Sequence, residues 1–282
     1  MTTQFRCARP CASAVCLTGL LLLAHAARSA PPIEVGDYSD IDGGVGSLSI
    51  ALREDGVMAF ALQAQGANLH VCDVVGTIRD GQARIEGFST PGQVCVIDFR
   101  AVTDPAGPTV GAAPASGHNA IEVSVNGAPG SFEACRTFCG MRASFDRTYY
   151  RMPAGCNAKA RQETYSAFKL AEKDKNYRAG FDILQPLQSR CGRYLGWLEQ
   201  DKVHNHLALM LHGLGRDVEC LQELGRTAAG SADDEAALEK GFVGEPMSFE
   251  AYLPTARTTW TIRRRCSGEP APASPADGPA PR

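Results

Sequence analysis

The stretch that decides the fold is residues 134–156, which read A-C-R-T-F-C-G-M-R-A-S-F-D-R-T-Y-Y-R-M-P-A-G-C. Before this stretch, apolar residues alternate with polar ones, and after it they recur at helical spacing. We therefore predict an α+β protein. Its expected parts are a signal peptide at 1–26, an antiparallel β-barrel or sandwich domain at 33–152, an α-helical repeat-like domain at 153–266, and a disordered Pro/Ala-rich tail at 267–282.

The charge distribution changes at the same place. Residues 27–150 contain eight Arg, no Lys and fourteen acidic residues, whereas residues 151–282 contain eighteen basic and seventeen acidic residues. This coincidence favours a domain boundary there. Without the expected signal peptide the chain has 26 basic and 31 acidic residues. This acidic balance disfavours a nucleic-acid partner, which would require a basic face.

The first residues have the pattern of a signal peptide. Arg6 and Arg9 precede an apolar run from 12 to 26, which ends in Ala24-His25-Ala26, a small-x-small cleavage signature. Ala30 is a poorer cleavage point because Pro31 follows it. No later stretch approaches the roughly 20 apolar residues that a membrane span needs. We expect an exported protein, periplasmic in a bacterium or secreted, with no transmembrane segment in the mature chain.

Cleavage would remove three cysteines and leave an even number. The remaining eight are Cys72, Cys95, Cys135, Cys139, Cys156, Cys191, Cys220 and Cys266. An even count in an exported chain predicts a disulfide framework, and the alternative is a set of buried free thiols.

The N-terminal half shows the period of two that is typical of strands packed on one side. One-sided apolar sets are Leu48/Ile50/Leu52, Met58/Phe60/Leu62, Cys95/Ile97/Phe99 and Ile121/Val123/Val125. Asp80-Gly81, between 74–78 and 83–88, is a hairpin signal. We expect six or seven short strands. The aromatic residues between 142 and 152 are expected to pack the two halves together, and Tyr149 and Tyr150 would form a binding surface only if exposed.

The C-terminal half has helical spacing, and two segments within 157–226 resemble tetratricopeptide-type helical repeats. They are residues 175–184 (K-N-Y-R-A-G-F-D-I-L) and 205–224, which begins N-H-L-A-L-M-L-H-G-L-G-R. Gly180 and Cys220 occupy the position where the family has a small residue, at an offset of 40 rather than about 34. The resemblance implies helical hairpins and a protein-contact surface, and no chemistry.

The same resemblance implies a disulfide plan. In a helical hairpin the start of the first helix meets the end of the second, which pairs Cys156 with Cys191. A last helix folding back would pair Cys220 with Cys266. For the β half we favour Cys72–Cys95 and Cys135–Cys139. A three-strand meander would hold Cys72 and Cys95 a strand apart, so other pairings stay open there.

Several groups of residues were weighed as reactive or metal sites. The pair Cys135-x3-Cys139 suits a structural disulfide better than a reactive pair, and His70-x-Cys72 supplies only two metal ligands. Residues 37–43 lack the end ligands of a calcium loop. Helical histidines at 204, 206 and 212 lack zinc spacing and are expected on a solvated face. The possible acids Glu34, Asp98, Glu122 and Glu133 show no paired spacing, and the fragment Ser116-Gly117-His118 has no identifiable partner. The run Arg263-Arg264-Arg265 suits a helix C-terminus, where cations complement the helix dipole, or a binding site for an acidic partner.

No fingerprint of a hydrolase, nucleotide site or dinucleotide site is present in the sequence. We therefore expect no catalytic, cofactor-binding or metal-binding residue, and a non-enzymatic exported protein that binds another envelope or secreted protein. A sharper version is an inhibitor or immunity protein for a cell-wall hydrolase, because the N-terminal half is similar in outline to periplasmic lysozyme inhibitors. Their S-G-x-x-Y motif is absent, since Ser116-Gly117 has no tyrosine three residues on.

Two alternatives are an envelope-assembly scaffold that uses the helical half and, less favoured, a hydrolase with an unrecognised site. The oligomeric state stays open.

Overall fold

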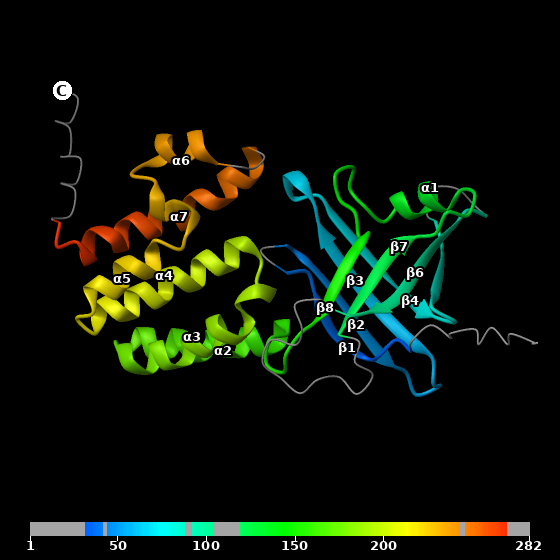
Figure 1. The fold of residues 1–282 in the computed structure, drawn as a ribbon, viewed down its shortest axis with the longest axis horizontal. Helices are drawn as coiled ribbons and strands as arrows, with labels where there is room; N and C mark the ends of the chain where they lie inside the picture. The colour runs from blue at the N-terminus through cyan, green and yellow to red at the C-terminus, as the bar shows by residue number, and fades with distance from the viewer. Residues whose placement is uncertain (1–31, 42–43, 88–91, 104–118, 243–245, 270–282) are drawn as a thin grey trace, which may run out of the picture. The chain divides into compact units, whose positions relative to one another are not determined.

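The computed structural model describes residues 32–41, 44–87, 92–103, 119–242 and 246–269 (Figure 1). The expected signal peptide and the fragment Ser116-Gly117-His118 lie outside these residues. So do Asp42 and Gly43 of the calcium-like turn and most of the Pro/Ala-rich tail.

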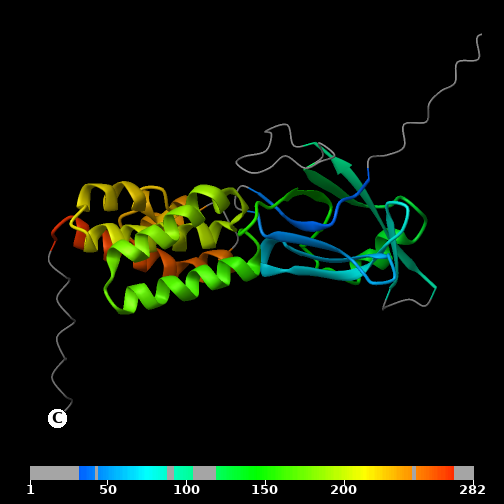
Figure 2. The ribbon, with the colours of Figure 1, turned by 90° about the horizontal axis from the view of Figure 1, so that it is seen from below.

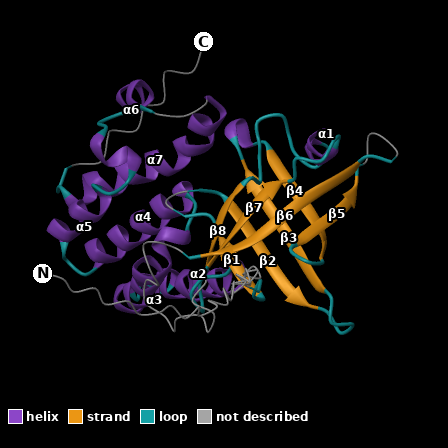
Figure 3. Ribbon diagram, turned by 45° about the vertical axis from the view of Figure 1, so that its right-hand side comes forward, coloured by secondary structure: helices purple, strands orange, loops and turns teal. Residues whose placement is uncertain are grey.

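The N-terminal half is one antiparallel sheet of eight strands in the order β4-β3-β2-β1-β8-β7-β6-β5 (Figures 1 and 3). The strands are β1 Gly36–Ser39, β2 Gly46–Leu52, β3 Met58–Gln65, β4 Val71–Ile78, β5 Gln82–Glu86, β6 Val94–Val102, β7 Ala120–Val125 and β8 Arg147–Arg151. This α+β layout, with a β part followed by helices, is the predicted fold class.

The two edge strands, β4 and β5, follow each other in the chain and nearly close the sheet into a barrel. Asp80 and Gly81 form the turn between them, with φ of 50° and 77°. Arg79 and Gln82 exchange two backbone hydrogen bonds of 2.8 and 2.9 Å across it. The expected turn is therefore present, but the ladder stops there. Beyond it β4 pairs with β3 and β5 pairs with β6, so the edges diverge.

Alternate residues of the strands fill the barrel interior. Leu48 and Leu62 are fully buried, and the rings of Phe60 and Phe99 meet edge to face at a centroid distance of 4.9 Å. Leu52 departs from the expected pattern, with 62% of its surface exposed. It is the last residue of β2, next to the turn at 53–57, where the barrel interior no longer covers it.

Two of the eight strands, β1 and β8, were not expected from the sequence. β1 pairs with both β2 and β8 and thereby joins the first three-strand meander to the rest of the sheet. Their sequences, GDYS and RTYYR, are short and show no alternation of apolar and polar residues or hairpin signal, which explains why they were missed. Tyr149 of β8 lies in the barrel core, so it packs the barrel rather than a contact between the two halves.

The disulfides of the barrel are Cys72–Cys139 and Cys95–Cys135, so the favoured pairs Cys72–Cys95 and Cys135–Cys139 were wrong. A short helix, α1 (Ser131–Arg136), lies over β6 and brings Cys135 to Cys95. After the helix ends, the chain pairs with the edge of β4 at an isolated bridge between Cys72 and Cys139. The two neighbouring cysteines of the 134–156 stretch therefore reach different strands instead of each other.

The C-terminal half is helical, with its first four helices packed consecutively side by side and its last helix packed on the third and fourth of them (Figure 2). The helices are α2 Ala158–Lys173, α3 Tyr177–Cys191, α4 Trp197–Gly213, α5 Asp217–Leu224, α6 Glu235–Gly241 and α7 Pro246–Cys266. Disulfides join Cys156 to Cys191 and Cys220 to Cys266, the two pairs expected from helical hairpins. None of the described helices combines the length and apolar character needed to cross a bilayer.

The turns α2–α3 and α4–α5 are equivalent at an offset of 40 residues. Asn176 N donates to Ala171 O and Arg216 N to Leu211 O, at 2.9 Å each. Each turn also has one residue with positive φ, Lys175 in the first and Gly215 in the second. At Gly180 of α3 a Cβ would lie 2.5 Å from the sulfur of Met210. The small residue therefore permits the close approach of α3 and α4.

Candidate functional site

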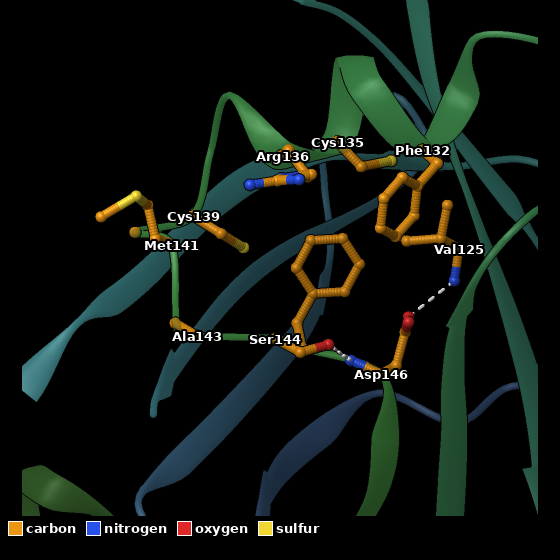
Figure 4. A pocket seen from close by; sticks show the side chains of 11 residues that line it. Val125, Phe132, Cys135, Arg136, Cys139, Met141, Ala143, Ser144 and Asp146 are labelled. Atoms are coloured by element: carbon orange, nitrogen blue, oxygen red, sulfur yellow. Dashed lines mark hydrogen bonds between the residues drawn. The ribbon is translucent and has the colours of Figure 1, made fainter. Parts of the chain in front are cut away.

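A small hollow of about 220 Å³ lies beside the barrel, between α1 and the loop that leads to β8 (Figure 4). It is built largely from the 134–156 stretch. Its lining residues are Val125, Phe132, Cys135, Arg136, Cys139, Gly140, Met141, Ala143, Ser144, Phe145 and Asp146.

Both barrel disulfides fix the walls of this hollow. Cys95–Cys135 ties α1 to β6, and the buried Ser131 hydroxyl adds a 2.9 Å hydrogen bond from the Val96 backbone N–H. Cys72–Cys139 ties the segment after α1 to β4. The hollow is therefore held in shape by two covalent links to two different strands, which reduces the entropy lost when a ligand binds.

The lining is apolar at its floor and at its rim. Phe145 forms part of the barrel core and is only 2% exposed, whereas Phe132 and Met141 are 57% and 81% exposed. In Figure 4 Phe132 and Met141 lie at opposite sides of the hollow, with Cys135 and Arg136 between them. Exposed apolar side chains around a hollow are typical of contact sites, because covering them removes apolar surface from water.

Two polar side chains of the hollow, Asp146 and Ser144, accept hydrogen bonds from backbone N–H groups. Asp146 Oδ1 accepts a 2.7 Å hydrogen bond from Val125 N, and Ser144 Oγ accepts one of 3.1 Å from Asp146 N. Arg136 lies over the ring of Phe132, with its guanidinium carbon 6.0 Å from the ring centroid. Among the lining residues no histidine stands next to Ser144 as a general base. The arrangement suits binding of an apolar group with an anion near Arg136.

The cysteines and the histidine considered as reactive or metal-binding residues of the barrel stabilise or pack the fold. Cys135 and Cys139 are bonded to the strand cysteines Cys95 and Cys72, so none of the three weighed cysteines has a free thiol. His70 lies against Gly140, where a Cβ would stand 2.5 Å from Nδ1. Glycine at 140 therefore lets the chain pass this histidine closely.

The acidic residues are dispersed over separate ion pairs and hydrogen bonds. Glu34 pairs with Arg151 at 2.5 Å, and Glu122 pairs with Arg100. Asp98 accepts from Gln82 and Asn126, while Glu133 lies in the first turn of α1. In the calcium-like segment, Asp37 accepts from Ser49 and Asp40 pairs with Arg147. These contacts do not bring two of the four weighed acids together as a catalytic pair.

The expectation of a solvated histidine face on α4 was wrong. His204 is 6% exposed and its Nδ1 lies 2.8 Å from Glu223. His206 packs on Phe168, and burial lowers the pKa of its imidazole from the ordinary value. Helical spacing indicates which residues share a face, but α3, α5 and α7 all pack on α4 and decide which faces are covered.

At the end of α7, Arg263 reaches Asp233 at 3.4 Å and the backbone oxygen of Gly230 at 3.3 Å. It therefore joins α7 to the segment before α6, while Arg264 and Arg265 lie with it in the last helical turn.

Comparison with protein-family models, with curated proteins and with solved structures gives no match for this chain. What the structure itself establishes is a barrel-like sheet, a helical region and four disulfides. Four disulfides suit an oxidising, exported location.

Sequence reasoning missed Phe132 and Met141 as surface residues. Their position could have indicated exposure, because each lies two or three residues from a cysteine of the 134–156 stretch and belongs to no alternating or helical apolar set. Tyr149 is fully buried and Tyr150 is half-buried, so the tyrosines named from the sequence do not form an open surface.

Proposed function

We propose that this chain is a non-enzymatic exported protein-binding module that captures its partner at the hollow beside α1. The observation that carries the proposal is the pair of exposed side chains, Phe132 and Met141, around a hollow that two disulfides hold in shape. A rigid apolar hollow of this size accepts one or two partner side chains. Arg136 at its rim favours a carboxylate on the same partner.

The partner class that suits an exported, disulfide-linked barrel best is a secreted or envelope protein, and a cell-wall hydrolase is the specific candidate. In an inhibitor or immunity protein, a preformed hollow receives a projecting loop of the enzyme and covers its active site. Preorganisation favours slow dissociation, since little ordering is required on binding.

The test uses a panel of purified muramidases, with complex formation measured by biolayer interferometry and inhibition measured as slower clearing of a cell-wall suspension. We expect complex formation and slower clearing with at least one muramidase. Met141→Glu and Phe132→Ala should each weaken that complex at least tenfold, because truncating or charging an apolar hot-spot residue costs about 2 kcal/mol or more. The matched control is Leu170→Glu, an exposed leucine on α2.

The outcomes separate the alternatives. Absence of complex and of inhibition across the panel would remove the hydrolase-inhibitor assignment. Loss of binding with Leu170→Glu, and not with the two hollow variants, would instead favour the scaffold function through the helices. That second candidate is supported by the equivalent turns at an offset of 40 residues, a feature of helical proteins that bind partners along repeated surfaces.

A further inference from the structure

A second group of side chains gathers around the disulfide between α5 and α7. His212 Nδ1 and Asp217 Oδ1 are 2.6 Å apart. One ring nitrogen of His212, one carboxylate oxygen of Asp217 and the sulfur of Cys266 all lie within 4.8 Å of one another. Cys220 is bonded to that sulfur. Four side chains from α4, α5 and α7, each of a type that binds zinc, are therefore neighbours.

In the oxidised chain this group is not a zinc site. Zinc binds the thiolate form of cysteine, and both sulfurs are joined in the disulfide. His212 and Asp217 alone are two ligands, fewer than the four of a structural zinc site.

We propose that the reduced chain binds one zinc ion through Cys220, Cys266, His212 and Asp217. A small-molecule dithiol supplies the two electrons and two protons that convert the disulfide into two thiols, and is itself oxidised to a cyclic disulfide. Zinc then replaces both thiol protons, which pass to the solvent. The resulting set of two sulfurs, one nitrogen and one oxygen is of the kind that zinc accepts in tetrahedral sites.

For zinc to bind, the two sulfurs, joined in the disulfide, would move apart, and the ligand atoms of His212, Asp217 and Cys266 would approach one another. With zinc–sulfur distances of about 2.3 Å and zinc–nitrogen or zinc–oxygen distances of about 2.0–2.2 Å, tetrahedral ligand atoms lie roughly 3.3–3.8 Å apart. The side chains of His212 and Asp217 are 33% and 47% exposed, so both have room to rotate and the ion has a path from the solvent. The Cα atoms of the two cysteines are 6.3 Å apart, which leaves the two thiolates facing one another after reduction.

As a consequence, a zinc ion would link helices α4, α5 and α7 in place of the disulfide. The disulfide joins α5 to α7. The zinc ion would join both to α4 through His212, and would therefore replace the covalent link whenever the thiols are reduced. This site is distinct from the hollow beside α1 and does not depend on the proposed function.

The experiment titrates Co²⁺, as a spectroscopic stand-in for Zn²⁺, into the full chain before and after reduction. We expect no signal from the oxidised chain. After reduction, one equivalent of Co²⁺ should give sulfur-to-metal charge-transfer absorption and the intense visible bands of tetrahedral cobalt. Adding Zn²⁺ should bleach both and raise the melting temperature of the reduced chain. Far-ultraviolet circular dichroism establishes that the reduced chain keeps its helices.

Three variants test the assignment of ligands. His212→Gln and Asp217→Asn keep all cysteines and should each lower the Zn²⁺ affinity at least tenfold. His70→Gln is the matched control, because His70 lies beside the Cys72–Cys139 disulfide, and it should leave the titration unchanged. A reduced chain without the cobalt signal would overturn the proposal. So would equal affinities in His212→Gln, Asp217→Asn and the wild type, since the metal would then be held by other thiols.

Discussion

The interior of the barrel and the interior of the helical half are built on different principles. Two buried hydroxyl residues, Ser39 and Ser131, are the polar members among the described buried residues of the barrel. The helical half buries six polar or charged residues, which are Asp201, His204, Asn205, Thr227, Thr255 and Thr259.

The difference follows from where backbone groups are satisfied. In the barrel the ladders pair the backbone N–H and C=O groups within the sheet, so the interior side chains can be apolar. In the helical half the short segment Ala228–Ser231 packs on the core through the buried Ala229, while Ala228 and Ser231 are exposed. Asp201 and the Tyr252 hydroxyl accept the N–H groups of Ala228 and Ala229 at 2.8 Å each. Asp201 therefore has a hydrogen-bond partner in an irregular segment that packs on the helices, whereas Asn205 and Thr259 bond between α4 and α7.

The largest loss of folding stability is expected from a substitution in the apolar interior of the barrel. Leu62 in β3 is fully buried, so Leu62→Ala should destabilise the chain by about 2–5 kcal/mol through lost burial and a residual cavity. Leu52→Ala, at the exposed end of β2, should change stability by less than about 0.5 kcal/mol. Urea unfolding followed by circular dichroism measures both. Equal effects would show that the barrel interior does not carry the stability of this half.

An intermediate loss of folding stability is expected from a substitution in the buried polar network of the helical half. Tyr252→Phe removes the hydroxyl that donates to Asp201 at 2.5 Å and accepts from Ala229 N. Because a buried N–H and a buried carboxylate each lose a partner, we expect a loss of about 1–3 kcal/mol. Burial raises the pKa of this tyrosine and also that of Asp201, consistent with a shielded pair. The control is Tyr150→Phe in β8, and a neutral Tyr252→Phe would contradict the structural role of the network.

The smallest effect on folding stability is expected from protonation of His206 at low pH. Burial against Phe168 lowers the pKa of His206 from its ordinary value of 6.5; Glu172 opposes this shift, and Lys169 and Lys202 add to it. The folded state therefore binds a proton less readily than the unfolded chain. The stability contribution is complete above pH 6.5 and declines as the pH falls through the folded pKa.

Melting temperatures between pH 8 and pH 5 measure this effect. We expect a shallower acid decline for His206→Gln than for the wild type, with the two curves running parallel above the ordinary pKa. An unchanged slope in the variant would assign the acid sensitivity of the helical half to other groups.

Much of this architecture could be predicted from local pattern. Alternation located four strands, Asp80-Gly81 located two more and the turn between them, and the resemblance to helical repeats implied the pairs Cys156–Cys191 and Cys220–Cys266. These predictions succeeded because each depends on residues that are close in sequence or on helices that fold back on one another.

The sites were less predictable. Nothing local indicates that Cys135 and Cys139, four residues apart, reach two different strands. Nor does a local pattern indicate that Phe132 and Met141 stay exposed around a hollow, or that His212 and Asp217 approach the Cys220–Cys266 disulfide.

By itself, then, the sequence determined the α+β class, the position of the change from strand to helix in residues 134–156, and the type of most elements. The tertiary structure alone decided the joining of the two parts of the sheet through β1 and β8, the disulfide partners in the barrel, and which polar side chains of α4 are buried. The physical reason is that side-chain period depends on the local backbone, whereas strand order and helix packing depend on contacts between segments far apart in the chain.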